Sequence, residues 1–257
     1  MKTDKIKFDP EVYEFYKGAL EGAGFAASFS AEDIPRMREA EITGHAAHLD
    51  PYEVHEKTDL TIPRGSAGDL PVRIYIPEGA ADAAGQVPVI LYFHGGGFIM
   101  GSIKDHDPLC GKLADAAGAI VIAAEYRLAP ENPFPACIED AVCLAEWAHE
   151  NAAAFGGDPE LIMAAGDSSG ATISAALALL GRDGKAPAIS GLILMYGVFG
   201  CISLEESESA RLYGQGEYIL PVDAIKKMMN LYIPAGTDPN DIRLYPGRAA
   251  DFSGMPP

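Results

Sequence analysis

The chain has 257 residues, of which 48% are hydrophobic and 22% are charged, a composition that predicts one large globular domain with a sizeable core. Its 37 acidic residues outnumber its 19 basic residues and give a formal net charge of −18, which excludes nucleic acid and anionic membranes as expected partners because like charges repel. The four cysteines form no CxxC pair and the first residues lead into no long apolar stretch, so we expect reduced thiols, no membrane span and a cytoplasmic location.

The first 50 residues have the apolar spacing of helices. Apolar side chains from Val12 to Leu20 recur at helical intervals, and a second helical stretch is expected at Ile34–Ile42. We predict that residues 1–50 form an accessory helical segment. Residues 51–257 are expected to form the core, with a second accessory segment near 201–235, all within one structural unit.

From about Glu56 the pattern changes to strands and then to short apolar stretches that alternate with helices. Strands are predicted at Thr58–Ile62, Val72–Ile76, Val87–Phe93, Ala119–Ala124, Leu161–Ala165 and Leu192–Tyr196. Helices are predicted at Pro108–Ala117, Phe134–Asn151, Ser168–Leu180 and Pro221–Tyr232. Right-handed crossovers between such elements build a mostly parallel central sheet with helices on both faces, which places the chain in the α/β class.

The pentapeptide Gly166-Asp167-Ser168-Ser169-Gly170, called the nucleophile elbow below, is the strongest chemical signal in the chain. It follows a predicted strand and opens a predicted helix, the setting in which a GxSxG serine projects its hydroxyl from the end of a sheet. Glycine is expected at Gly166 and Gly170 because a larger side chain would collide in so sharp a turn. Ser168 is therefore the predicted catalytic nucleophile.

A second glycine motif, His94-Gly95-Gly96-Gly97-Phe98, follows a predicted strand and is called the oxyanion loop below. Backbone amides without a neighbouring Cβ can approach a substrate oxygen closely. We predict an oxyanion hole formed by the amides of Gly96, Gly97 and Ser169, with the His94 ring and Gly95 supporting the loop. The alternative is a flexible or phosphate-binding loop, but neither GxGxxG nor GK[ST] accompanies the motif.

These motifs resemble those of the hormone-sensitive-lipase-like esterases, in the branch whose nucleophile motif begins Gly-Asp-Ser. The similarity extends from Pro10 to Pro257 and includes Gly101-Ser102, His106-Asp107, Tyr126 to Glu131, Phe134 to Ala136, Glu139 to Ala141 and Gly156 to Pro159. One departure is Ser169-Gly170-Ala171, where the family has Ala-Gly-Gly.

The resemblance implies an α/β-hydrolase fold with an N-terminal helical cap. It also implies hydrolysis of short-acyl carboxylic esters through an acyl-enzyme on Ser168, so the expected partner is a small-molecule ester, and neither a cofactor nor a metal is implied. In the family, Tyr126 to Glu131 resembles a structural brace, within which we expect an ion pair between Arg127 and Glu131.

A serine hydroxyl needs a base, and in α/β-hydrolases the acid and then the histidine follow the serine along the chain. No histidine follows Ser168, since all six precede it: His45, His48, His55, His94, His106 and His149. Four aspartates follow it but precede the family's next strand, expected near Met255: Asp223, Asp238, Asp241 and Asp251. We therefore expect a truncated chain with a C-terminally incomplete core, whose catalytic Asp and His lie in a missing C-terminal segment. The strand Leu192–Tyr196 would then be an exposed sheet edge open to self-association.

Three interpretations stay open. The first is a serine carboxylesterase whose base and acid lie in the missing segment. The second is a non-catalytic, receptor-like binder of small molecules on the same fold, as in the plant gibberellin receptor, which resembles this family and keeps the serine without the histidine. The third is an inactive truncated fragment.

Overall fold

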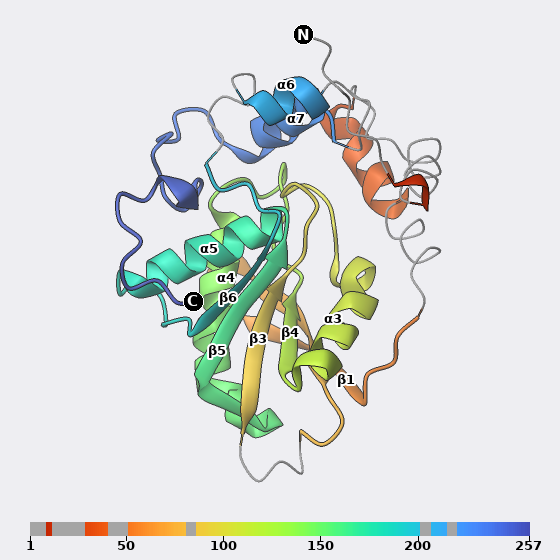
Figure 1. The fold of residues 1–257 in the computed structure, drawn as a ribbon, viewed down its shortest axis with the longest axis vertical. Helices are drawn as coiled ribbons and strands as arrows, with labels where there is room; N and C mark the ends of the chain where they lie inside the picture. The colour runs from red at the N-terminus through yellow and green to blue at the C-terminus, as the bar shows by residue number, and fades with distance from the viewer. Residues whose placement is uncertain (1–8, 12–28, 41–50, 81–85, 201–206, 215–219) are drawn as a thin grey trace.

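The computed structural model describes residues 9–11, 29–40, 51–80, 86–200, 207–214 and 220–257. Its centre is a six-stranded sheet in the order β1-β2-β4-β3-β5-β6 (Figure 1). The strands are β1 Glu56–Pro63, β2 Asp69–Ile76, β3 Val87–Phe93, β4 Ile120–Ala124, β5 Gly157–Asp167 and β6 Gly191–Met195. β1 and β2 pair antiparallel with their neighbours, whereas β4, β3, β5 and β6 run parallel, so the predicted mostly parallel sheet is confirmed.

Helices cover both faces of the sheet because side chains alternate between the two faces along each strand. On β3, Leu91 and Phe93 belong to the core cluster that includes residues of α4 and α5, whereas Tyr92 belongs to the cluster that includes residues of α3. The helices are α3 Ile103–Ala117, α4 Ala136–Asn151 and α5 Ser169–Arg182. Figure 1 shows α3 on one side of the strands and α4 and α5 on the other.

A group of helical segments lies beyond the carboxyl ends of the parallel strands (Figure 1). It contains α6 Glu208–Tyr213, α7 Val222–Tyr232, the short 3-10 helix Ala31–Asp33 and the helical residues 34–40. The ammonium of Lys227 in α7 lies 5.6 Å from the centre of the Phe29 ring, so the N-terminal segment and α7 are neighbours. The predicted helix at Ile34–Ile42 is confirmed in its described part. Much of 1–50 and parts of 201–235 lie outside the described residues, so the domain boundaries stay predictions.

In the described parts of the chain, three further 3-10 helices connect the main elements: Gly65–Ala67, Ala152–Phe155 and Pro246–Arg248. Cys110, Cys137 and Cys143 are free thiols. Among the residues that the structure describes, no helix combines the length and the apolar character needed to cross a membrane.

The start of α3 differs from the prediction. The helix begins at Ile103, and Pro108, expected at its start, lies inside it. Ser102 explains the earlier start, because its hydroxyl accepts a hydrogen bond from the Asp105 amide over 3.2 Å and donates one to the Asp105 carboxylate over 2.6 Å. Such a cap satisfies amides that the first turn leaves without partners. A cap formed by one serine outweighed the usual preference of proline for the first turn.

The expected ion pair between Arg127 and Glu131 is wrong. Arg127 instead binds the buried carboxylate of Asp140 over 2.9 Å. Glu131 is bound by Arg38 of the N-terminal segment over 2.9 Å. Both partners come from other elements, and no local spacing in the sequence indicates them.

β6 lies at one edge of the sheet, as expected for the predicted strand Leu192–Tyr196. The Leu192 amide donates to the carbonyl of Pro257 over 2.9 Å. Leu194 and Tyr196 have 37% and 76% of their surface exposed. Self-association through this edge stays a prediction.

Candidate active site

The nucleophile elbow lies at the carboxyl end of β5. Asp167 is the last residue of β5 and Ser169 the first of α5, so Ser168 forms the whole turn between strand and helix. Its φ of 52° and ψ of −116° are strained for a residue with a side chain, and its amide donates to the Met195 carbonyl of β6 over 2.9 Å. The local sequence thus folds into the strained turn that a GxSxG serine needs.

Close backbone contact, rather than an unusual φ, explains the two glycines of the elbow. A Cβ on Gly166 would lie 2.5 Å from both the Gly170 carbonyl carbon and the Phe93 carbonyl oxygen. A Cβ on Gly170 would overlap the Phe93 carbonyl and lie 2.7 Å from the His94 carbonyl oxygen. The first turn of α5 therefore rests directly on the start of the oxyanion loop.

The oxyanion loop has a conformation that requires glycine. Gly96 and Gly97 have φ values of 121° and 62°, in the region that residues with side chains rarely adopt. The Gly96 carbonyl accepts hydrogen bonds from the amides of Ile99 and Met100 over 3.2 and 3.0 Å, which closes a tight turn. Within the described part of the chain, the amides of Gly96, Gly97 and Ser169 donate to no protein acceptor. These three amides are free to bind a ligand oxygen.

His94 is enclosed in protein. Its side chain is 2% exposed, its Nδ1 lies 2.7 Å from the Gly95 carbonyl oxygen, and its ring stacks on Tyr126 at 4.2 Å between centres. Burial, with repulsion from His106, lowers the pKa of His94 to about 3. A neutral ring held against the loop backbone by its Nδ1 fits the predicted supporting role.

His106 lies behind the elbow, on the first turns of α3. Its Nε2 is 3.3 Å from Oδ1 of Asp167. Although burial would lower it, the pKa of His106 is raised above its ordinary value by the hydrogen bond and charge of that carboxylate. The sequence places Asp167 within the elbow but gives no signal for this partner, which comes from another element.

The hydroxyl of Ser168 has no hydrogen-bond partner among the residues described. His149 binds the Ala145 carbonyl within its own helix, with the two atoms 2.8 Å apart. His55 directly precedes β1, whose first residue pairs with the last residue of β2, at the end of the sheet opposite Ser168. His45 and His48 lie outside the described residues. The base expected in a later segment of the chain is therefore not replaced by a described histidine.

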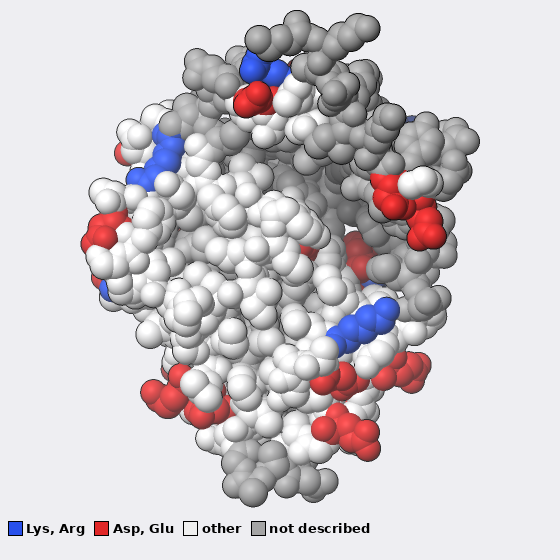
Figure 2. All heavy atoms as spheres, in the orientation of Figure 1, with Lys and Arg blue, Asp and Glu red and all other residues white. Residues whose placement is uncertain are grey.

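α7 covers the oxyanion loop. A Cβ on Gly97 would overlap the sulfur of Met228 and lie 3.3 Å from its Cγ. The rings of Phe98 and Tyr232 stack in parallel with centres 3.9 Å apart. The surface is hollowed beneath the helical segments at this end of the molecule (Figure 2). A substrate at Ser168 would thus be bounded by α7 as well as by the sheet.

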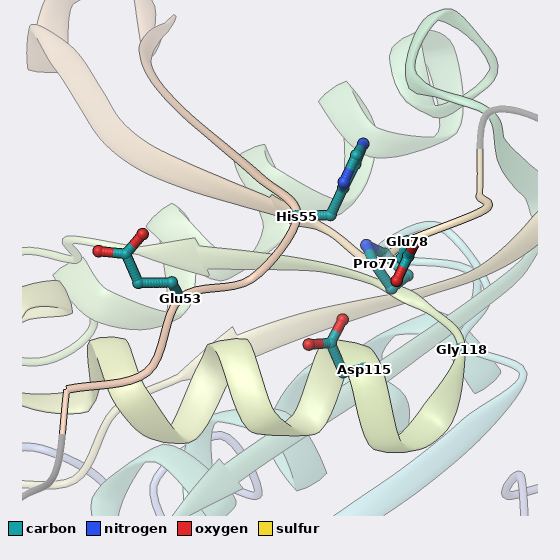
Figure 3. Close-up of a pocket in the computed structure, with 6 residues that line it drawn as sticks. All are labelled: Glu53, His55, Pro77, Glu78, Asp115 and Gly118. Atoms are coloured by element: carbon teal, nitrogen blue, oxygen red, sulfur yellow. The ribbon is translucent and has the colours of Figure 1, made fainter.

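A second concavity lies at the opposite end of the sheet (Figure 3). It is lined by Glu53, His55, Pro77, Glu78, Asp115 and Gly118. Tyr52 donates a hydrogen bond to Asp115 over 2.6 Å, so one of the carboxylates that line this concavity already has a protein partner. Over the described ranges, no group of His, Cys, Asp and Glu side chains is arranged to hold a metal ion.

Strained serine, glycine loop and mostly parallel sheet together define an α/β-hydrolase. A family model described as the alpha/beta hydrolase fold matches residues 90–257. Carboxylesterase NlhH of Mycobacterium tuberculosis is 36% identical over 245 residues, which cover 91% of this chain and 72% of that protein. Esterase LipI of the same species is 40% identical over 202 residues, 77% of this chain and 61% of that protein.

Solved structures agree with these relatives. An ester hydrolase from the metagenome of Lake Arreo superposes with a TM-score of 0.86 at 32% identity, covering 98% of this chain and 78% of that one. The chain therefore belongs to the hormone-sensitive-lipase-like esterases of the α/β-hydrolase family, and by family it is a carboxylic ester hydrolase. The expected fold class and family are confirmed.

Proposed function

We propose that the chain is a serine carboxylesterase that hydrolyses short-acyl esters through an acyl-enzyme on Ser168. The observation that carries this proposal is the strained Ser168 turn at the carboxyl end of β5, with the unpaired amides of the oxyanion loop on the adjacent strand. The relatives named above, which are called esterase or carboxylesterase, support the same class of substrate.

Acylation uses groups that these elements provide. Ser168 Oγ attacks the ester carbonyl carbon and gives its proton to a base, while the carbonyl oxygen gains negative charge. The amides of Gly96, Gly97 and Ser169 donate to that oxyanion, and one such donor is worth about 2.7–4 kcal/mol of transition-state stabilisation. Ser169 opens α5, whose N-terminal dipole favours negative charge at the same place.

Collapse of the tetrahedral intermediate breaks the bond to the alcohol oxygen, which leaves with the proton that the base accepted. Water then attacks the acyl carbon, gives a proton to the base and passes through a second oxyanion in the same site. Collapse of this second intermediate breaks the bond between Ser168 Oγ and the acyl carbon, and Oγ takes the proton back from the base. The products are the carboxylic acid and free Ser168. No electron transfer and no cofactor enter this balance.

The base is the part of the mechanism that residues 1–257 do not supply in the order usual for the fold, because no histidine follows Ser168. The proposal keeps the base and its orienting acid in a later segment, as expected from the sequence. The unpartnered Ser168 hydroxyl supports this proposal. Sequencing the gene past codon 257 tests it: an Asp followed by a His is expected, and a stop codon there would contradict it.

Hydrolysis of a short-chain aryl ester tests the function itself. We expect saturable turnover that falls steeply in Ser168→Ala, with a small residual rate from the oxyanion donors and substrate binding. Equal rates for the two proteins would overturn the proposal. Tight binding of a small molecule without turnover would instead support the receptor-like interpretation.

A further inference from the structure

Asp167 directly precedes the proposed nucleophile, and its side chain lies on the face of the sheet that packs against α3. Ala165 and Asp167 share one face of β5, because side chains on a strand alternate with a period of two. Ala165 packs in the cluster that contains Tyr92 and residues of α3. The carboxylate of Asp167 is therefore enclosed between the sheet and α3, with 8% of the residue exposed.

Three donors from three different elements meet at one oxygen of this carboxylate. Oδ1 of Asp167 accepts hydrogen bonds from the Tyr92 hydroxyl over 2.7 Å and from the Gly95 amide over 2.9 Å. It also faces Nε2 of His106 at 3.3 Å. These donors come from the end of β3, from the oxyanion loop and from α3.

Gly95 fits directly against the carboxylate. A Cβ at that position would overlap Oδ2 of Asp167 and lie 3.0 Å from its Cγ. The first glycine of the loop is thus required by contact with Asp167, whereas Gly96 and Gly97 are required by their φ values. The loop and the elbow fit together at this one residue.

A buried carboxylate is costly unless it is paired and hydrogen-bonded, and His106 provides the opposite charge. Burial would raise the pKa of Asp167, but the hydrogen bond and charge of His106, with the donors Tyr92 and Gly95, keep it below its ordinary value. The neighbouring His94 stays neutral. Each member of the pair of Asp167 and His106 therefore favours the charged form of the other, and a charged carboxylate strengthens the hydrogen bond from Gly95.

We propose that Asp167 is a positioning residue that fixes the oxyanion loop to the nucleophile elbow, with His106 as its counter-charge. Asp167 is bonded covalently to Ser168 and by hydrogen bond to Gly95, whose neighbours Gly96 and Gly97 provide the proposed donors. It sets the spacing between the nucleophile and those donors without touching substrate. This inference rests on the proposed function, since it concerns the oxyanion hole of that reaction.

The first test is kinetic and uses variants of the carboxylate and of its tyrosine. Asp167→Ala is expected to lower kcat by about 10- to 100-fold, less than loss of a whole oxyanion donor, with KM changed by less than about threefold because ground-state binding stays. Asp167→Asn keeps an oxygen for Gly95 and Tyr92 and is expected to recover part of that loss. Tyr92→Phe leaves Gly95 bonded and is expected to have a smaller effect.

The chain offers a matched control one residue further along α3. Tyr75 donates to Asp107 over 3.0 Å, and Asp107 also binds Arg73, in an arrangement that does not contact the oxyanion loop. Tyr75→Phe and Asp107→Asn should therefore leave kcat unchanged even where they lower the unfolding midpoint. An equal fall of kcat in Asp107→Asn and Asp167→Asn would overturn the proposal.

The second test is independent of turnover. Hydrogen exchange followed by NMR is expected to show the Gly95 amide protected in the wild type and exchanging at least about tenfold faster in Asp167→Ala, because its acceptor is gone. Unchanged protection would overturn the inference even if the enzyme is active. If the wild type hydrolyses no ester, the proposed function fails, and the exchange result alone decides whether Asp167 holds the loop.

Discussion

Gly170 is the position where the structure predicts the sharpest response to a single methyl group. In Gly170→Ala, the new Cβ would lie 2.6 Å from the Phe93 carbonyl carbon and 2.7 Å from the His94 carbonyl oxygen. The Phe93 carbonyl oxygen lies closer still, and ordinary contacts are about 3.5–4.0 Å, so α5 and the start of the oxyanion loop must separate by about 1.5 Å or more. All the obstructing atoms are backbone, so no side-chain rotation can relieve the overlap.

Overpacking of this kind costs about 1–3 kcal/mol, and the backbone overlap places Gly170→Ala at the upper end of that range. For a protein of this size, about 3 kcal/mol lowers the unfolding midpoint by about 6–12 °C. Thermal unfolding followed by circular dichroism measures this shift. Ester hydrolysis should fall as well, because the elbow moves away from the oxyanion donors.

Gly184→Ala is the matched control for this substitution. Gly184 has a φ of 68°, and a methyl group added there would have no neighbouring atom within 4 Å, so only left-handed strain of about 1–2 kcal/mol is expected. Activity should stay at the wild-type rate. An unfolding midpoint for Gly170→Ala no lower than that of Gly184→Ala would refute the steric reasoning.

Three further predictions concern substitutions of residues outside the elbow. Arg38→Gln removes charged hydrogen bonds to the Ile99 carbonyl and to Glu131, and with allowance for partial exposure it is expected to lower the free energy of unfolding by about 1–2 kcal/mol. Urea denaturation measures this change, and an unchanged unfolding midpoint would contradict the prediction. The pKa of His106 in the folded protein lies above 6.5, so the stability that the charged ring gives the fold is fully present below pH 6.5 and is lost as pH rises through that pKa. The difference in unfolding free energy between wild type and His106→Gln should therefore shrink over that rise, and a constant difference would count against the ion pair. Tyr196→Lys places a charge beside the exposed edge of β6 and is expected to reduce any self-association in analytical ultracentrifugation, whereas an unchanged distribution would point to another surface.

Local patterns in the sequence are sufficient to predict an element whose structure depends on residues that are close together along the chain. The strand Val87–Phe93 is predicted with its observed bounds because its apolar residues end sharply at the oxyanion loop. The Ser168 turn is predictable because so sharp a turn has room only for glycine two residues before and two residues after the serine, at Gly166 and Gly170. The same two glycine motifs indicate the proposed nucleophile and the proposed oxyanion donors.

Contacts between distant segments are not predictable in the same way. The sequence pairs Arg127 with the wrong carboxylate because Asp140 and Arg38 approach the brace only after the chain has folded. The partnership of Asp167 with His106 depends on which face of β5 meets α3, and one sequence gives no measure of that packing. The helix start at Ile103 is missed because the Ser102 cap competes with a proline signal of similar strength.

Covalent labelling with a fluorophosphonate, read by intact mass and then by peptide mapping, measures most directly whether Ser168 is an activated nucleophile. The protein to label is the whole gene product, which includes the later segment proposed to hold the base. We expect a single adduct, located on Ser168 and absent from Ser168→Ala. Protein that is folded by circular dichroism but forms no adduct, or an adduct on any other residue, would contradict the assignment of Ser168 as an activated nucleophile.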